Sequence, residues 1–125
     1  TEATAFNPRA VAALKRVGLE INSDDVSAEN PKYQIRWTAS RSPYLAFSKK
    51  YDHPDHPQHN FAAIMVCTEA DQGCPFVPGT DFRFSLPYED PKAFDGTALE
   101  SSKYDERCRQ IGREMLYLLS LIQVH

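Results

Sequence analysis

The spacing of apolar residues predicts a short helix near the start of the chain. Small and aliphatic residues recur at helical spacing across residues 8–17. Asn7 is a residue type that caps helix N-termini, Pro8 suits the first turn, and Gly18 suits the left-handed position after the last turn. The stripe that we expect to be buried comprises Ala10, Leu14 and Val17, flanked by Val11, Ala13 and Gly18.

A second and longer helix is predicted from about Ser101 to the end of the chain. Its apolar residues recur at spacings of four and three, which is the period of one helix face. These residues are Tyr104, Cys108, Ile111, Met115, Leu118 and Ile122. We expect this face to pack against the rest of the protein.

Other patterns fill the region between the two helices and predict strands. The continuous apolar run of residues 61–67 is typical of a strand covered on both faces, as in the parallel sheet of an α/β protein. Residues 81–86 alternate between apolar and polar and predict a second strand. Shorter alternating stretches at 33–37 and 44–48 predict a two-stranded excursion, and the proline-broken residues 49–60 predict an exposed loop.

Composition narrows the class of protein. The chain has 125 residues, of which 42% are hydrophobic and 25% charged, and this predicts a single globular domain rather than a disordered segment. The net charge is -3 and no basic stripe is present, so we expect no nucleic-acid partner. No apolar run approaches the ~18 residues of a membrane span, and the start lacks the regions of a signal peptide. We therefore expect a cytoplasmic chain with no membrane partner.

The segment "VCTEADQGCP", residues 66–75, contains two of the three cysteines, Cys67 and Cys74. Their spacing alone is compatible with a metal clamp, a structural disulfide, two inert residues or a redox pair. Cysteine pairs that bind zinc usually have two to four residues between them and are joined by a second pair, so the spacing disfavours a metal clamp. The third cysteine, Cys108, falls on the apolar stripe of the last helix, where a packing role is expected.

Three histidines in "HPDHPQH" are the other group with ligand chemistry. His53, His56 and His59 are weak candidate ligands for zinc or another divalent ion. Two prolines keep this stretch extended, which makes convergence of three imidazole nitrogens demanding. We therefore expect a solvated loop, no metal and no cofactor.

Three stretches together resemble the low-molecular-weight protein tyrosine phosphatase superfamily, in particular its thioredoxin-coupled arsenate reductase branch. They are "NPRAVAALKRVGLEI" at 7–21, "AIMVCTEADQGCP" at 63–75 and "LPYEDPKAFDGT" at 86–97. The first is generic, whereas a cysteine pair followed by an acidic Asp-Pro loop is more specific. The likeness covers most of the chain except residues 22–60, which are expected to be an insertion.

This resemblance implies an α/β fold of three layers, with a short parallel sheet of strand order 2-1-3-4 flanked by helices. The family's phosphate-binding loop, a cysteine followed by five residues and an arginine, is not found in these 125 residues. We therefore expect residues 1–125 to form one domain that is incomplete at its N-terminus and covers the part after the second strand. The missing segment, expected upstream of Thr1, would supply the nucleophile and the substrate-binding groups, and the chain alone is expected to be inactive.

The resemblance also implies roles for three residues. Asp90, which precedes Pro91, matches the general acid that protonates the leaving oxygen, although Asp-Pro is also a common turn sequence. Cys67 would resolve the arsenate adduct by forming a disulfide, and Cys74 would take over that disulfide and present it to thioredoxin. The expected substrate is a small oxyanion or a phosphomonoester.

Two alternatives remain open. The same scaffold hydrolyses protein phosphotyrosine or aryl phosphomonoesters in other branches, but those enzymes carry aromatic residues just after Asp-Pro, where this chain has Lys92 and Ala93. The other alternative is a non-catalytic binding or regulatory module that lacks the reactive loop.

Overall fold

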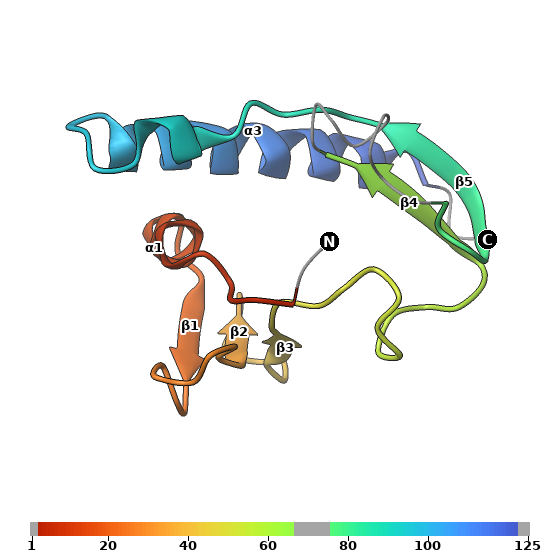
Figure 1. The fold of residues 1–125 in the computed structure, drawn as a ribbon, viewed down its shortest axis with the longest axis horizontal. Coiled ribbons are helices and arrows are strands. Elements are labelled where there is room, and N and C mark those ends of the chain that lie inside the picture. Colours follow the sequence, from red (N-terminus) through yellow and green to blue (C-terminus); the bar gives the residue numbers. More distant parts are fainter. Residues whose placement is uncertain (1–2, 67–75, 123–125) are drawn as a thin grey trace. The chain divides into compact units, whose positions relative to one another are not determined.

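The chain folds into a mixture of helices and strands (Figure 1), which confirms the predicted α/β class. The computed structural model describes residues 3–66 and 76–122. In chain order its elements are α1 (Pro8–Arg16), β1 (Glu20–Ser23), β2 (Tyr33–Arg36), β3 (Tyr44–Ala46), β4 (Phe61–Met65), β5 (Thr80–Ser85), the 3₁₀ helix η1 (Pro91–Phe94) and α3 (Glu100–Ser120). No helix among these is long and apolar enough to span a membrane.

Helix α1 begins and ends where local sequence signals predict. The side-chain oxygen of Asn7 accepts a hydrogen bond from the Arg9 amide at 2.8 Å, Pro8 opens the first turn, and Gly18 has a φ of 100°. A side-chain cap of this kind stabilises a helix by about 1 kcal/mol. The predicted stripe is wrong at its end, because Val17 is the C-cap residue and remains 48% exposed. The helix instead buries Val11 and Ala13.

The predicted strands at 33–37 and 44–48 are present as β2 and β3 in a three-stranded antiparallel sheet of order β1-β2-β3. Its first strand, β1, was not predicted. The strand is only four residues long, and one apolar residue, Ile21, is buried to 3% exposure. So short a segment offers no period for a pattern to reveal.

Strands β4 and β5 pair in parallel, as the apolar run predicted. Residues Ala63, Ile64 and Met65 lie opposite Arg83, Phe84 and Ser85, with a register irregularity between Phe61 and Ala62. The expectation that β4 is covered on both faces is wrong. In the part of the chain that is described this sheet has two strands, Ala62 is exposed, and the other residues of β4 are half-buried.

Helix α3 is the longest element, with 21 residues, and α1 packs against it. Tyr104 is buried to 5% exposure, and the next three residues of the predicted stripe are half-buried. At the far end Leu118 and Ile122 are 40% and 58% exposed. The predicted packing face is therefore formed over the first half of the helix and not over its last turns.

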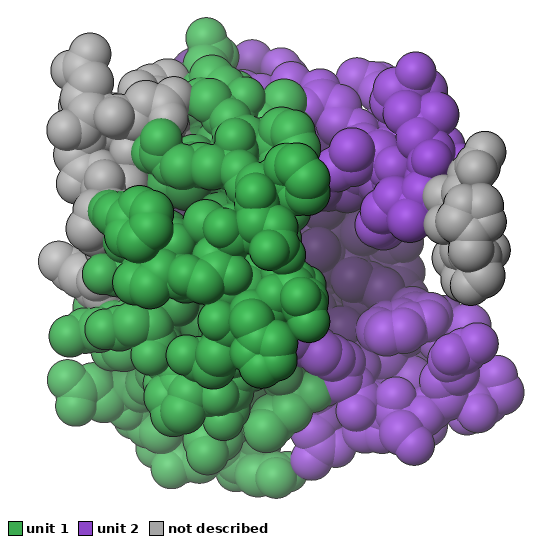
Figure 2. Space-filling view, turned by 90° about the vertical axis from the view of Figure 1, so that its right-hand side faces the viewer, with its two compact units in different colours: residues 1–6, 23–33, 45–90 green, residues 7–22, 34–44, 91–125 purple. Residues whose placement is uncertain are grey.

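Two compact units make up the structure (Figure 2). Unit 1 comprises residues 1–6, 23–33 and 45–90, and unit 2 comprises residues 7–22, 34–44 and 91–125. The parallel pair β4–β5 belongs to unit 1, whereas α1, η1 and α3 belong to unit 2.

Candidate functional site

Parallel pairing brings the carboxyl ends of β4 and β5 to the same edge of their sheet. Beyond the two strands the pairing continues, because the Leu86 amide donates to the Met65 carbonyl at 2.8 Å and the Tyr88 amide donates to the Val66 carbonyl at 2.9 Å. Tyr88 is buried, at 8% exposure. Ligands in α/β proteins bind at this edge of a parallel sheet, so the segments that follow Val66 and Tyr88 are candidates for a site.

The sequence-predicted residues follow directly on these two segments. Cys67 comes one residue after Val66 in the chain, and it lies with Cys74 outside the described residues. Asp90 comes two residues after Tyr88 and is exposed. The backbone therefore places the residues before Cys67 beside the residues before Asp90.

The substrate-binding groups implied by the resemblance stay a prediction. They are expected upstream of Thr1, and Thr1 itself lies outside the described residues, which begin at residue 3.

After Asp90 the chain forms a compact turn in unit 2. Pro91 opens η1, and Gly96 adopts a φ of 75°, which a residue with a side chain rarely does. The Gly96 amide donates to the Glu100 carboxylate at 2.6 Å. Glu100 lies in the first turn of α3, so this bond fixes the turn to the start of the helix.

A buried tyrosine links this turn to both helices. The Tyr104 hydroxyl donates to the Asp95 carboxylate at 3.0 Å and accepts from the Asn7 side-chain amide at 3.3 Å. Burial, with a further contribution from the bond to Asp95, raises the pKa of Tyr104. The hydroxyl is therefore held protonated as a donor to Asp95.

Arg9 connects the same groups from the side of α1. Its Nε lies 2.8 Å from the Glu100 carboxylate and 3.5 Å from that of Asp95. The bond from Gly96 and the contact with Arg9 lower the pKa of Glu100, so this carboxylate is ionised at neutral pH. We call the set Asn7, Arg9, Asp95, Glu100 and Tyr104 the turn network.

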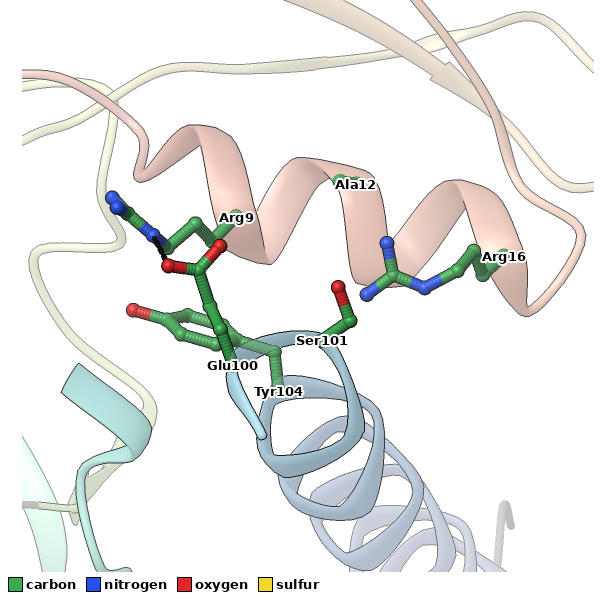
Figure 3. A pocket seen from close by; sticks show the side chains of 6 residues that line it. All are labelled: Arg9, Ala12, Arg16, Glu100, Ser101 and Tyr104. Carbon is green, nitrogen blue, oxygen red and sulfur yellow. Dashed lines mark ion pairs between the residues drawn. The ribbon is translucent and has the colours of Figure 1, made fainter. Parts of the chain in front are cut away.

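A shallow depression adjoins the turn network between α1 and α3 (Figure 3). It is lined by Arg9, Ala12, Arg16, Glu100, Ser101 and Tyr104 and has a volume of about 50 Å³. A water molecule occupies ≈ 30 Å³ of liquid and pockets for organic ligands measure ≈ 300–1,000 Å³. The depression therefore has room for water or a small ion but not for an organic substrate.

Charge balance further restricts what this depression can hold. Arg16 forms a 2.6 Å ion pair with Asp105, and Arg9 is paired with two carboxylates. Both guanidinium groups are thus already neutralised by side chains of unit 2, which gives the depression little attraction for an anion. We therefore assign the residues of the depression a structural role, in which Glu100 and Tyr104 hold the turn after Asp90.

The three histidines are not brought together as a ligand set. Within the described residues, no group of three histidine, cysteine, aspartate or glutamate side chains is placed to hold a metal ion. His53 contacts His56 edge to face, with ring centroids 6.3 Å apart, and its Nδ1 accepts a hydrogen bond from the Asp55 amide at 3.1 Å. That bond occupies one of the two ring nitrogens of His53.

Cys108 lies half-buried on α3 as a free thiol. Burial and the neighbouring Asp105 carboxylate raise its pKa, and a thiol with a raised pKa is a poor nucleophile at neutral pH. This agrees with the packing role that the stripe predicted.

The turn network is what reasoning from the sequence missed. Tyr104 was predicted as an apolar stripe residue, and neither Arg9 nor Glu100 was singled out. The bond from the Gly96 amide to Glu100 had no local signal, because the known capping box joins positions three residues apart and these two are four apart. The contacts from α1 had no local signal.

Comparison of the chain with models of known protein families, with curated proteins and with solved structures gave no match.

Proposed function

We propose that this chain supplies the general acid and the resolving thiols of a low-molecular-weight phosphatase-like site that acts on a tetrahedral oxyanion, with arsenate reduction as its reaction. The observation that carries the proposal is the bond between the Tyr88 amide and the Val66 carbonyl. It supports a common location for the segments that lead to Cys67 and Asp90, at the edge of a parallel sheet where such sites form. The three-layer arrangement and the strand order 2-1-3-4 are part of this proposal.

The proposed reaction reduces arsenate to arsenite by two electrons, which come from thiols. A thiolate from a Cys-x5-Arg loop outside these 125 residues attacks arsenate, and Asp90 protonates the oxygen that leaves as water. Cys67 then attacks the sulfur of that adduct, so that a disulfide forms and the arsenic leaves as arsenite with two more electrons. Cys74 exchanges into the disulfide, and a thioredoxin-type dithiol reduces the resulting Cys67–Cys74 bond.

The turn network supports the proposed role of Asp90 by fixing the residues that follow it. Asp95 and Gly96 are each held by a hydrogen bond, from Tyr104 and to Glu100 respectively. A general acid has to be held within hydrogen-bonding reach of the leaving oxygen. The turn that follows Asp90 in the chain is therefore anchored at two residues within unit 2.

The test is a thiol assay on the full chain carrying Cys108→Ser, so that Cys67 and Cys74 are the remaining thiols. We expect mild oxidation to convert both thiols into one intramolecular disulfide, and thioredoxin to restore them. The controls are Cys67→Ser and Cys74→Ser in the same background, each of which should keep one thiol and form no intramolecular bond. Two free thiols after oxidation, or a disulfide that thioredoxin does not reduce, would contradict the relay.

A second candidate function, a non-catalytic binding module, is favoured by the apolar end of α3. Leu116, Tyr117 and Leu119 are 71%, 67% and 61% exposed, and large apolar side chains exposed next to one another are a feature of interaction surfaces. A binding module has no need of a reversible disulfide. The oxidation assay therefore separates the two candidates, since an inert thiol pair favours the binding module.

A further inference from the structure

Two lysines converge on one aromatic ring in unit 1. The ammonium nitrogen of Lys49 lies 4.0 Å from the centroid of the Phe47 ring, and that of Lys32 lies 5.3 Å from the same centroid. His53 packs edge to face on this ring, with centroids 5.4 Å apart. We call Lys32, Lys49, His53 and Phe47 the Phe47 cluster.

The backbone around the cluster is held by a two-bond clamp. The side-chain nitrogen of Asn30 donates to the Ser48 carbonyl at 2.8 Å, and its oxygen accepts from the Ser48 amide at 3.1 Å. Asn30 stands two residues before Lys32, and Ser48 stands between Phe47 and Lys49. One amide side chain thus fixes both chain segments that carry the lysines, so the two charges converge because of the fold.

The imidazole of His53 is the third polar group of the cluster, and the loop orients it. The Asp55 amide donates to Nδ1 of His53 at 3.1 Å, and the His53 amide itself donates to the Lys50 carbonyl at 3.1 Å in a turn. With Nδ1 accepting, the ring proton of a neutral imidazole resides on Nε2. His53 therefore has a hydrogen-bond donor on Nε2 in addition to its contact with Phe47.

Among the described residues, no carboxylate pairs with the two lysines of the cluster. Lys103 also lies over a ring, that of Phe94 at 5.4 Å, but it is paired with Glu106 at 2.9 Å. Within residues 3–66 and 76–122 neither Lys32 nor Lys49 forms an ion pair. The ring attracts each ammonium but carries no net charge, so in the described part of the chain both ammonium groups lie over one ring without a carboxylate partner.

We propose that the Phe47 cluster binds a tetrahedral dianion of the phosphate class, either the free ion or a phosphomonoester. The two ammonium groups supply charge, and Nε2 of His53 supplies a directed hydrogen bond. The Asp55 carboxylate lies 3.8 Å from Nδ1 of His53, the ring nitrogen that the proposed hydrogen bond does not use. The site is independent of the proposed function, because it uses neither Cys67, Cys74 nor Asp90.

The experiment is an NMR titration of the full chain with inorganic phosphate at neutral to mildly basic pH and constant ionic strength, with sodium chloride as the reference salt. We expect saturable shifts confined to Phe47, His53 and their neighbours. Lys32→Gln and Lys49→Gln should each weaken phosphate binding about tenfold, since each removes one positive charge from the site. The matched control is Lys50→Gln, an exposed lysine next in sequence that does not contact the ring.

Two results would overturn the proposal. One is that Lys49→Gln and Lys50→Gln weaken phosphate binding equally, which would show that phosphate is attracted to surface charge in general. The other is the absence of saturable phosphate shifts in a chain whose spectrum is otherwise that of the folded protein. A parallel titration with phenyl phosphate identifies the form of the ligand, because tighter binding than inorganic phosphate assigns the ester and equal binding assigns the free ion.

Discussion

Tyr104 carries two kinds of interaction at once. Its ring is buried against α1, and its hydroxyl joins Asn7 to Asp95. Removing a buried hydroxyl that is hydrogen-bonded on both sides leaves both partners without that bond. This hydroxyl therefore holds the turn after Asp90 together with the bond from Gly96 to Glu100.

We predict that Tyr104→Phe lowers the free energy of unfolding of the helical part by about 1 kcal/mol, the usual net value of such hydrogen bonds. The measurement is a urea melt followed by far-ultraviolet circular dichroism. Tyr117→Phe is the control, since that side chain is 67% exposed and its loss should change stability by less than ~0.5 kcal/mol. Equal effects of the two substitutions would contradict the assigned role of the hydroxyl.

Alkaline titration gives a second expectation for the same residue. Burial raises the pKa of Tyr104 above its ordinary value of 10.0, so the folded chain holds this proton more tightly than the unfolded chain does. The stabilisation is complete below pH 10.0 and is lost as the pH rises through the higher folded-state pKa. We expect an ultraviolet titration to show Tyr104 ionising after the exposed tyrosines, and this late step to be missing in Tyr104→Phe.

Glu100 is expected to make the helices sensitive to acid. The Gly96 amide and then Arg9 lower the pKa of this carboxyl below its ordinary value of 4.5. Its contribution is therefore present above pH 4.5 and is lost as the pH falls through the lower folded-state pKa. Urea melts over this acidic range should show falling stability, and Glu100→Gln should flatten that dependence. An unchanged slope in the variant would rule out Glu100 as its source.

Between the elements, Gly18 and Gly79 both have a positive φ but differ in how much space a side chain would find. Gly79, at the turn into β5, has a φ of 78°, and a side chain there would collide with the Gln58 carbonyl. Gly18, after α1, has a φ of 100° with open space around it. The first position is constrained by both backbone conformation and a neighbour, and the second by conformation alone.

We predict that Gly18→Ala costs about 1 kcal/mol, the strain of a left-handed residue with a side chain, and that Gly79→Ala costs more. The two effects should also fall in different units. Gly18→Ala should lower the stability of α1 and α3, and Gly79→Ala should mainly accelerate amide exchange in β4 and β5. A smaller effect of Gly79→Ala on exchange would contradict the close approach of Gln58.

The elements themselves differ in how far sequence predicts them. Helix α1 was predictable because Asn7, Pro8 and Gly18 are local signals that act within a few residues. The parallel pairing of β4 and β5 was predictable from one continuous apolar run. Strand β1 was not predictable, because four residues are too few to show a period. The exposure of Ala62 and Val66 was not predictable either, because the segments that would cover a strand lie elsewhere in the sequence.

The candidate site shows the same division. Asp90 and the two thiols were selected by local motifs, and the parallel pairing of β4 and β5 supports a common edge for the segments that lead to Asp90 and Cys67. The turn network joins Asn7 to Tyr104 across 97 positions of the chain. No local period or motif relates residues so far apart, so this part of the site required the folded structure.

For the whole molecule, the small number of buried side chains sets the expected stability. The buried hydrophobic residues among those described are Val11, Ala13, Ile21, Tyr88 and Tyr104. Four of these belong to unit 2 and one, Tyr88, to unit 1. A parallel pair of strands needs further strands or helices for independent stability, and unit 1 buries little to provide it.

We predict that the two units of the isolated chain unfold in separate steps. Amide hydrogen exchange should be fastest in β4 and β5 and slowest in α1 and the first half of α3, because local stability follows local burial. The measurement is residue-resolved exchange by NMR with increasing urea. If the amides of all these elements lost their protection from exchange together, in one sharp transition, the prediction would be contradicted.

Asn7 has a consequence for the order in which the protein folds. Its oxygen caps α1 through Arg9, two residues away, and its nitrogen bonds Tyr104, 97 residues away. The first bond forms as soon as a helical turn appears, whereas the second waits for closure of a long loop. One side chain thus contributes to an early local event and to a late docking event. Asn7→Ser keeps the capping oxygen and loses the second bond, so it should leave helix initiation intact and speed the undocking of α3.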